Sequence, residues 1–293
     1  MQAKFLSHKR FIAVVSAMLV SVPLVSFVMS SHASAEPALA VLWRQEFNGK
    51  NNTSVSSKFW GYDLGGLNAN SEEQFYTKRS KNIRMDGNGN LVVQARPIIE
   101  GSKEWLKCIS CKFSSARIKT QDKLGFKYGR LEARMKMPAG QGTWPAFWML
   151  GTNLERLGWP DAGEIDIVEA RGADPTMVFG TIHGPGYNGS QGTQIGDVTY
   201  SPTALSENFH IYAIEWTPNT IKWFFDGKLY FTATKTSVAP DDWVFNKPYF
   251  MIINLAMGGT FAGDLDPNLT GATMYIDYVR YYKLGKYGRI YDL

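Results

Sequence analysis

Three acidic residues stand close together in the stretch 163–169 (GEIDIVE), namely Glu164, Asp166 and Glu169. The residues between them are β-branched and apolar, which favours a strand over a helix. Side chains alternate along a regular strand, so Glu169 would point away from the other two acids, towards an apolar side where an unpaired carboxylate is costly. A β-bulge at Ile167 and Val168 would insert one extra residue and bring Glu169 back. The spacing therefore predicts a bulged strand whose three carboxylates line one groove.

Two glutamates that face one groove could cleave a glycosidic bond. With the bulge absorbing one step, Glu164 and Glu169 lie about four strand rises apart, or ~13 Å between Cα atoms at ~3.3 Å per residue. Side chains that lean towards each other across the shorter Asp166 could bring the carboxyl groups to the ~5–5.5 Å of a retaining glycosidase, whereas an inverting enzyme needs a wider gap. A solvated acidic strand face is the alternative interpretation.

The rest of the chain must form the scaffold that holds this strand. From Val41 onward the sequence alternates in short runs between turn residues, without a long amphipathic helical stretch. Asp226 and Gly227 indicate a tight hairpin turn, and residues 257–260 (MGGT) a flexible loop. The pattern predicts an all-β fold, an antiparallel β-sandwich with a concave groove. The expected strands are 91–96, 115–120, 130–137, 209–216, 221–225, 228–232, 249–256 and 274–282.

The N-terminal segment has the composition of a secretory signal peptide. Three basic residues precede an apolar run over 11–29, and Ala33-Ser34-Ala35 offers a small-residue cleavage site. We expect residues 1–35 to be removed after Ala35, which leaves 36–293 as a single catalytic domain of a secreted protein. An uncleaved membrane anchor is the alternative, although Pro23 within the run favours cleavage.

Composition limits the partners of the mature chain. The formal charge of the 293 residues is +5, and it falls to +2 without the three basic residues of the signal segment. No block of like charge remains, so neither nucleic acid nor a strongly acidic ligand is expected. The two cysteines, Cys108 and Cys111, suit a small disulfide loop in an exported protein, since partners for a zinc site are lacking.

The acidic strand and several further stretches resemble glycoside hydrolase family 16, in its laminarinase-like branch. The segment from Glu164 to Glu169 is similar to the bulged E-x-D-x-x-E signature of that branch. The supporting stretches are 128–134 (YGRLEAR), 142–151 (GTWPAFWMLG), 180–183 (GTIH), 214–216 (IEW) and 254–259 (NLAMGG).

The resemblance implies a jelly-roll (concanavalin A-like) sandwich that cleaves internal β-linkages of a glucan with retention. Glu164 would be the nucleophile, Glu169 the general acid and then base, and Asp166 the carboxylate between them. The bulge favours β-1,3-glucan of the laminarin or cell-wall type as substrate. The chain would need no cofactor for catalysis and would act as a monomer, away from the membrane once the signal is removed. A transglycosylase and a non-catalytic β-glucan-binding protein are the alternatives.

Sugar rings stack on flat aromatic side chains while their hydroxyl groups accept and donate hydrogen bonds. Trp144, Trp148 and Trp159 flank the acidic strand in sequence and are the candidate platforms, with Trp148 the one whose apolar neighbours suggest a core position. Further candidates for contact with the substrate are His183, Asn70, Glu72, Arg117 and Tyr187, the last in a glycine-rich loop over 184–189 that we expect to be mobile.

The resemblance also implies a structural calcium ion, remote from the acids. Glu46 and Asp277 match its two carboxylate ligands, and a backbone carbonyl near Gly89 would be a third. Hard oxygen ligands of this kind suit Ca²⁺.

Overall fold

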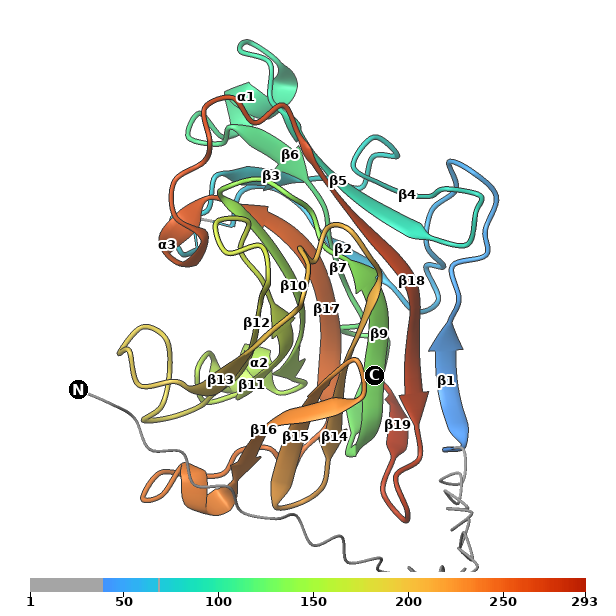
Figure 1. The fold of residues 1–293 in the computed structure, drawn as a ribbon, viewed down its shortest axis with the longest axis vertical. Coiled ribbons are helices and arrows are strands. Elements are labelled where there is room, and N and C mark those ends of the chain that lie inside the picture. The colour runs from blue at the N-terminus through green and yellow to red at the C-terminus, as the bar shows by residue number, and fades with distance from the viewer. Residues whose placement is uncertain (1–38, 68) are drawn as a thin grey trace, which may run out of the picture. The chain divides into compact units, whose positions relative to one another are not determined.

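The computed structural model describes residues 39–67 and 69–293, so the predicted signal peptide and its cleavage site lie outside the described residues. Residues Leu39–Leu293 form one compact unit whose regular secondary structure is almost entirely strands, arranged in two large sheets. Figure 1 shows the sheets curving together around a concave side. Within the described part of the chain, no helix has the length and apolar character needed to cross a membrane.

The first sheet has ten strands, and its neighbours pair antiparallel except for β3 and β6, which run parallel. Strand β1 pairs with β18, and β4 with β5, beside the main path. In spatial order the main path is β16 (Lys228–Thr234), β15 (Thr220–Phe225), β14 (His210–Trp216), β9 (Gly129–Lys136), β18 (Ala272–Tyr282), β5 (Leu91–Pro97), β6 (Phe113–Ser115) and β3 (Gln74–Tyr76); the strands beside it are β1 (Val41–Gln45) and β4 (Ile83–Met85).

The second sheet has nine antiparallel strands and holds the acidic strand between two neighbours. Its main path is β13 (Ile195–Tyr200), β12 (Met177–His183), β11 (Glu164–Glu169), β10 (Thr143–Gly151), β17 (Tyr249–Met257), β7 (Arg117–Lys119) and β2 (Gly61–Asp63). Strand β8 (Leu124–Lys127) pairs with β17, and β19 (Arg289–Asp292) pairs with β8. The predicted antiparallel sandwich is confirmed.

Helices are short in the part of the chain that the structure describes. They are α1 (Lys103–Lys107), α2 (Leu154–Leu157), α3 (Gly259–Ala262) and the 3₁₀ helix η1 (Lys235–Ser237). The prediction of a flexible loop over 257–260 was wrong. Met257 ends β17, and the chain turns directly into α3, with Gly258 and Gly259 both at positive φ, which only glycine adopts without strain.

The core lies between the two sheets, where the alternating side chains of both meet. On β10, Phe147 and Met149 point inward and are almost fully buried, each contributing roughly 1.5–3 kcal/mol of burial energy. Every residue of β17 is buried, which matches its nearly continuous apolar sequence. The core therefore fixes the inward face of the second sheet and leaves the other face of β10 and β11 for a groove.

One expected strand turned out to be two. Residues 115–120 were predicted as a single strand, but Ser115 ends β6 in the first sheet and Arg117 begins β7 in the second. The chain changes sheets at the fully buried Ala116, whose carbonyl accepts a hydrogen bond from Leu255 N. The alternation of side chains continues through this step, so the sequence pattern does not reveal it.

Candidate active site

The acidic strand carries the bulge that its spacing predicts. On β10, Ala146 lies opposite Glu169 and Trp148 lies opposite Asp166, so one residue of β11 has no partner between them. The pairing of β11 with β12 shifts at the same place. Residues Ile165, Ile167 and Val168 are buried in the core, and the three acids line one groove. The predicted bulge is confirmed.

The groove measures about 430 Å³ and crosses the strands of the second sheet. It collects six of the residues predicted to contact substrate together with the three acids. Asn254 of β17, a leucine that precedes β3 and the first leucine of α2 complete much of its lining. The predicted contact residues in the groove are Asn70, Glu72, Arg117, Trp144, Trp148 and Trp159, and the leucines are Leu67 and Leu154.

Two tryptophans hold the two glutamates. The indole Nε1 of Trp144 donates a hydrogen bond of 2.8 Å to Glu169 Oε1. The indole Nε1 of Trp159 donates one of the same length to Glu164 Oε2. Trp159 keeps 42% of its surface exposed, and Trp144 packs against Phe261 of α3. Each indole thus orients one carboxyl group and also offers a ring face in or beside the groove.

The suggestion that Trp148 is a core residue was wrong. Its ring lines the groove, because Trp144 and Trp148 are four residues apart on β10 and share a face. Its Nε1 donates to Asn254 Oδ1 at 2.7 Å, and the guanidinium of Arg117 lies 4.8 Å from the ring centre. Arg117 is held there by Asp63, 2.8 Å away. These contacts make a rigid polar and aromatic floor.

His183 lies beside the acids, opposite Glu164 on the neighbouring strand β12, and is absent from the groove lining although it was predicted to contact substrate. Its Nε2 lies 3.1 Å from Asp166 Oδ2 and 3.8 Å from Glu164 Oε1. Its Nδ1 accepts the backbone N–H of Gly189 at 3.0 Å, which places the ring hydrogen on Nε2, facing the acids. The Nε2–H is not aligned with Oδ2, which is buried without a hydrogen bond. His183 therefore faces the acid group from the neighbouring strand.

Burial sets the electrostatics of the three acids. It raises the pKa of Glu164, and the neighbouring Asp166 raises it further while His183 opposes the rise. Burial and the charge of Glu169 raise the pKa of Asp166. Burial also raises the pKa of Glu169, against the hydrogen bond from Trp144, and the carboxylate of Glu72 adds to the rise. A carboxyl group whose pKa is raised keeps its proton to higher pH than an exposed one does, which suits an acid catalyst.

The comparisons with known proteins agree with this geometry. The family model described as "Glycosyl hydrolases family 16" matches residues 70–280. The chain belongs to glycoside hydrolase family 16. A β-glucanase of Rhodothermus marinus is 38% identical over 270 residues, which cover 88% of this chain and 90% of the relative. The glucan endo-1,3-β-glucosidase A1 of Niallia circulans is 36% identical over 85% of this chain, although the match spans only 39% of that protein.

Solved structures give the same family 16 assignment. The laminarinase catalytic domain of Thermotoga maritima superposes with a TM-score of 0.77 at 38% identity, covering 85% of this chain and 99% of that domain. The laminarinase of Rhodothermus marinus superposes with a TM-score of 0.75, also at 38% identity, over 85% of this chain and 99% of the other. The predicted jelly-roll fold is confirmed.

Tyr187 does not lie in the groove of this family 16 protein, contrary to prediction. Only 2% of its surface is exposed, and its hydroxyl donates to the carbonyl of Asp242 at 2.9 Å. The ring lies against Gly184, where a Cβ atom would approach it to 2.4 Å. Burial of the aromatic ring is more favourable in free energy than its exposure at the groove rim. The loop over 184–189, which was expected to be mobile, is therefore anchored by its own tyrosine.

The side chains do not fit the predicted calcium site. Both Nε and an Nη atom of Arg280 bind Glu46, at 2.9 and 2.8 Å, and Arg134 binds Asp277 at 2.7 Å. Carboxylates neutralised in this way do not form an oxygen cage. Among the described residues, the one group of three possible ligands whose atoms lie within 4.8 Å of one another is Glu164, Asp166 and His183, which belongs to the acid site itself.

Three residues of the site escaped the sequence reasoning. Asn254 interrupts an otherwise apolar strand, and that interruption was the available signal. Gln74, 1% exposed, binds Glu72 through its amide nitrogen and accepts the N–H of Met257. Trp223 of the first sheet donates to the carbonyl of Asp166 at 2.7 Å, and no local pattern could have connected residues so far apart.

Proposed function

We propose that this chain is a secreted, retaining endo-β-glucanase that hydrolyses internal β-1,3 bonds of laminarin-like or cell-wall glucan. The observation that carries the proposal is the bulge in β11, because it places Glu164 and Glu169 in one groove with a tryptophan N–H on each. A retaining glycosidase needs two carboxyl groups on the two sides of the scissile bond, one to attack and one to protonate.

The first step would form a glycosyl-enzyme. The carboxylate of Glu164 attacks the anomeric carbon while Glu169 donates its proton to the leaving glycosidic oxygen. In the second step Glu169, now ionised, takes a proton from a water molecule, and this water releases the sugar from Glu164 with net retention. Neither step requires a cofactor.

Asp166 would serve as the proton reservoir beside the nucleophile. It is 2% exposed, and a hydrogen bond joins its carboxyl group to that of Glu164. The raised pKa values of both groups favour one proton shared between them near neutral pH. Attack requires Glu164 to be ionised, so the shared proton must then sit on Asp166, where it hydrogen-bonds the nucleophile and moderates its charge.

The preference for β-1,3-glucan rests on the bulged strand and on the printed names of the relatives. Two relatives at 38% and 36% identity are named as a β-glucanase and a glucan endo-1,3-β-glucosidase. Aromatic rings at Trp144, Trp148 and Trp159 suit the apolar faces of glucose units. Interception of the glycosyl-enzyme by a sugar hydroxyl would make the same site a transglycosylase, and product analysis distinguishes that outcome.

The decisive test is Glu164→Gln. This variant should fold and bind laminarin but lose at least about a thousandfold in the release of reducing ends, because the amide cannot act as the nucleophile. Glu207→Gln, at an exposed site, is the matched control and should keep full activity. Turnover by Glu164→Gln near the wild-type rate would remove Glu164 as nucleophile.

Substrate and stereochemistry need a second measurement. The wild-type protein should cleave laminarin in preference to xyloglucan and agarose, and proton NMR should find the β-anomer in the first product. Activity confined to agarose or xyloglucan would overturn the substrate proposal, and an initial α-anomer would overturn retention. Binding without any hydrolysis would identify a glucan-binding protein instead.

A further inference from the structure

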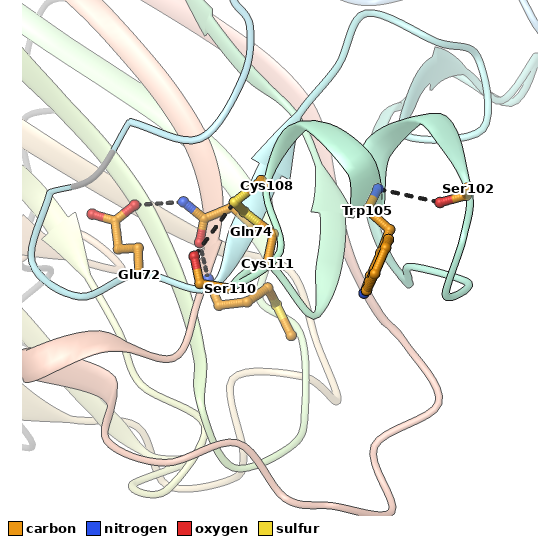
Figure 2. The surroundings of a disulfide bond; sticks show 8 residues. Glu72, Gln74, Ser102, Trp105, Cys108, Ser110 and Cys111 are labelled. Atoms are coloured by element: carbon orange, nitrogen blue, oxygen red, sulfur yellow. Dashed lines mark hydrogen bonds between the residues drawn. A yellow bond between two sulfur atoms is a disulfide. The ribbon is translucent and has the colours of Figure 1, made fainter.

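A disulfide-closed hairpin stands next to the groove without entering it. Residues 98–112 connect β5 to β6 and carry α1, and the hydrogen bond from Ile98 N to Lys112 O closes their base. Cys108 and Cys111, which suit a small disulfide loop by sequence, are bridged near the end of this hairpin. Figure 2 shows the bridge beside Gln74, which in turn binds Glu72.

The sulfur atoms pack directly on the backbone of a neighbouring segment. A Cβ atom on Gly66 would lie 3.1 Å from Cys108 Sγ and 3.4 Å from Cys111 Sγ. Cys111 is 4% exposed, so its sulfur is enclosed by this contact and its surroundings. A side chain at position 66 would therefore crowd the bridge, and the two would have to move apart by a few tenths of an ångström.

Residues 65–67 and 69–72, which we call the wall segment, form one side of the groove. Leu67, Ala69, Asn70 and Glu72 all line it. Among the described residues, Gly66 and Leu67 make no backbone hydrogen bond. Asn70 and Ser71 adopt positive φ values of 51° and 57°, a costly conformation for residues other than glycine that persists only when surrounding contacts enforce it.

The far end of the wall segment is well supported. Thr260 N donates to Asn70 O at 2.8 Å, Glu73 N donates to Met257 O at 2.7 Å, and Lys112 N donates to Glu73 O at 2.8 Å. The near end is held at Gly65, whose backbone N–H and carbonyl each form a hydrogen bond of 2.9 Å with Tyr76. Gly66 packs on the disulfide, and removing the bridge would take this packing partner away from Gly66 and the adjoining Leu67.

We propose that the Cys108–Cys111 bridge is a positioning device, which supports the wall segment at Gly66 so that the adjoining Leu67 keeps its place in the lining of the glucan groove. The inference rests on the proposed function, because it assumes that the groove binds glucan. The bridge touches neither substrate nor acids and acts through Gly66. Loss of the bridge would weaken binding of the substrate and of the transition state equally. KM should therefore rise while kcat stays the same.

The test compares Cys108→Ser/Cys111→Ser with Ser110→Ala, a control that leaves the bridge intact although Ser110 Oγ lies 3.6 Å from Cys108 Sγ. On laminarin, the double variant should raise KM about fivefold, roughly the loss of one apolar contact the size of a methylene group, with kcat unchanged. A disulfide that closes so small a loop restricts the unfolded chain only slightly. Its loss should therefore cost little stability, and the double variant should fold. An unchanged KM would overturn the inference, whereas a wild-type protein that leaves laminarin uncut would overturn the proposed function first.

Two further measurements keep the test decisive if the double variant does not fold. Dithiothreitol reduces the bridge to two thiols and becomes a cyclic disulfide itself, and it should raise the KM of the wild type but not that of the double variant. Gly66→Ala should raise KM with the bridge intact, because its Cβ displaces the wall segment. Gly61→Ala, whose Cβ would have no neighbour closer than 3.8 Å, is the matched control. Equal KM values for both glycine variants would contradict the proposal.

Discussion

Glu164 and Glu169 have the same side chain and similar burial. The proposed reaction nevertheless requires Glu164 to be ionised and Glu169 to be protonated. Each accepts a hydrogen bond from a different indole, Trp159 for Glu164 and Trp144 for Glu169. The hydrogen bond from Trp144 opposes the rise in the pKa of Glu169 that burial causes. A donor to the ionised form lowers the pKa of a carboxyl group, so we expect the indole of Trp159 to act in the same direction on Glu164. On this reasoning each tryptophan affects one limb of the pH profile.

Trp144→Phe and Trp159→Phe test this at the residue scale as a matched pair. Loss of the Trp144 N–H should raise the pKa of Glu169, so the acid keeps its proton longer and the alkaline limb of kcat/KM moves to higher pH. Loss of the Trp159 N–H should raise the pKa of Glu164, so the nucleophile ionises later and the acidic limb moves to higher pH. Rate profiles on laminarin from acid to alkaline pH measure both. Movement of the same limb in both variants would contradict the assignment of acid and nucleophile.

The bulge in β11 is stabilised by contacts with the opposite sheet. Trp223 lies on β15 of the first sheet, and its indole N–H crosses the core to the carbonyl of Asp166. Gly180 of β12 makes room for the ring, since a Cβ there would come within 2.6 Å of it. The irregular backbone that aims the acids is thereby fixed from behind by a fully buried side chain.

Trp223→Phe should therefore lower both stability and kcat. The loss of a buried hydrogen bond and of ring volume should cost about 1–3 kcal/mol. The backbone at Asp166 would shift, and small misplacements of catalytic groups cost about tenfold or more in rate. Trp216→Phe is the control, because its equally buried indole donates to Phe245 O, away from the bulge. Denaturant unfolding should show similar losses for the two variants, and equal kcat values would contradict a role for Trp223 in the bulge.

At the scale of the whole molecule, the alternation of polar and apolar residues predicted the individual strands. It did not predict features that depend on pairing between residues far apart in the chain. The strands from Leu91 to Pro97 and from Tyr249 to Met257 lie within a residue or so of expectation, because each depends on its own pattern. The bulge was predictable because three acids had to share a face. The change of sheet at Ala116 was not, since it depends on partners far along the chain. Trp148 was readable from its spacing to Trp144, but its apolar neighbours suggested the core.

The N-terminal segment yields the last prediction, which concerns the whole chain. We expect the exported protein to begin at Glu36, because the basic start, the apolar run and Ala33-Ser34-Ala35 together form a cleavable signal. The compact unit starts at Leu39, so this cleavage would leave it whole. A bridged cysteine pair is also suited to an oxidising compartment. N-terminal sequencing of the exported protein measures the site, and Ala35→Phe should block processing. A full-length chain that stays in the membrane fraction would favour an uncleaved anchor instead.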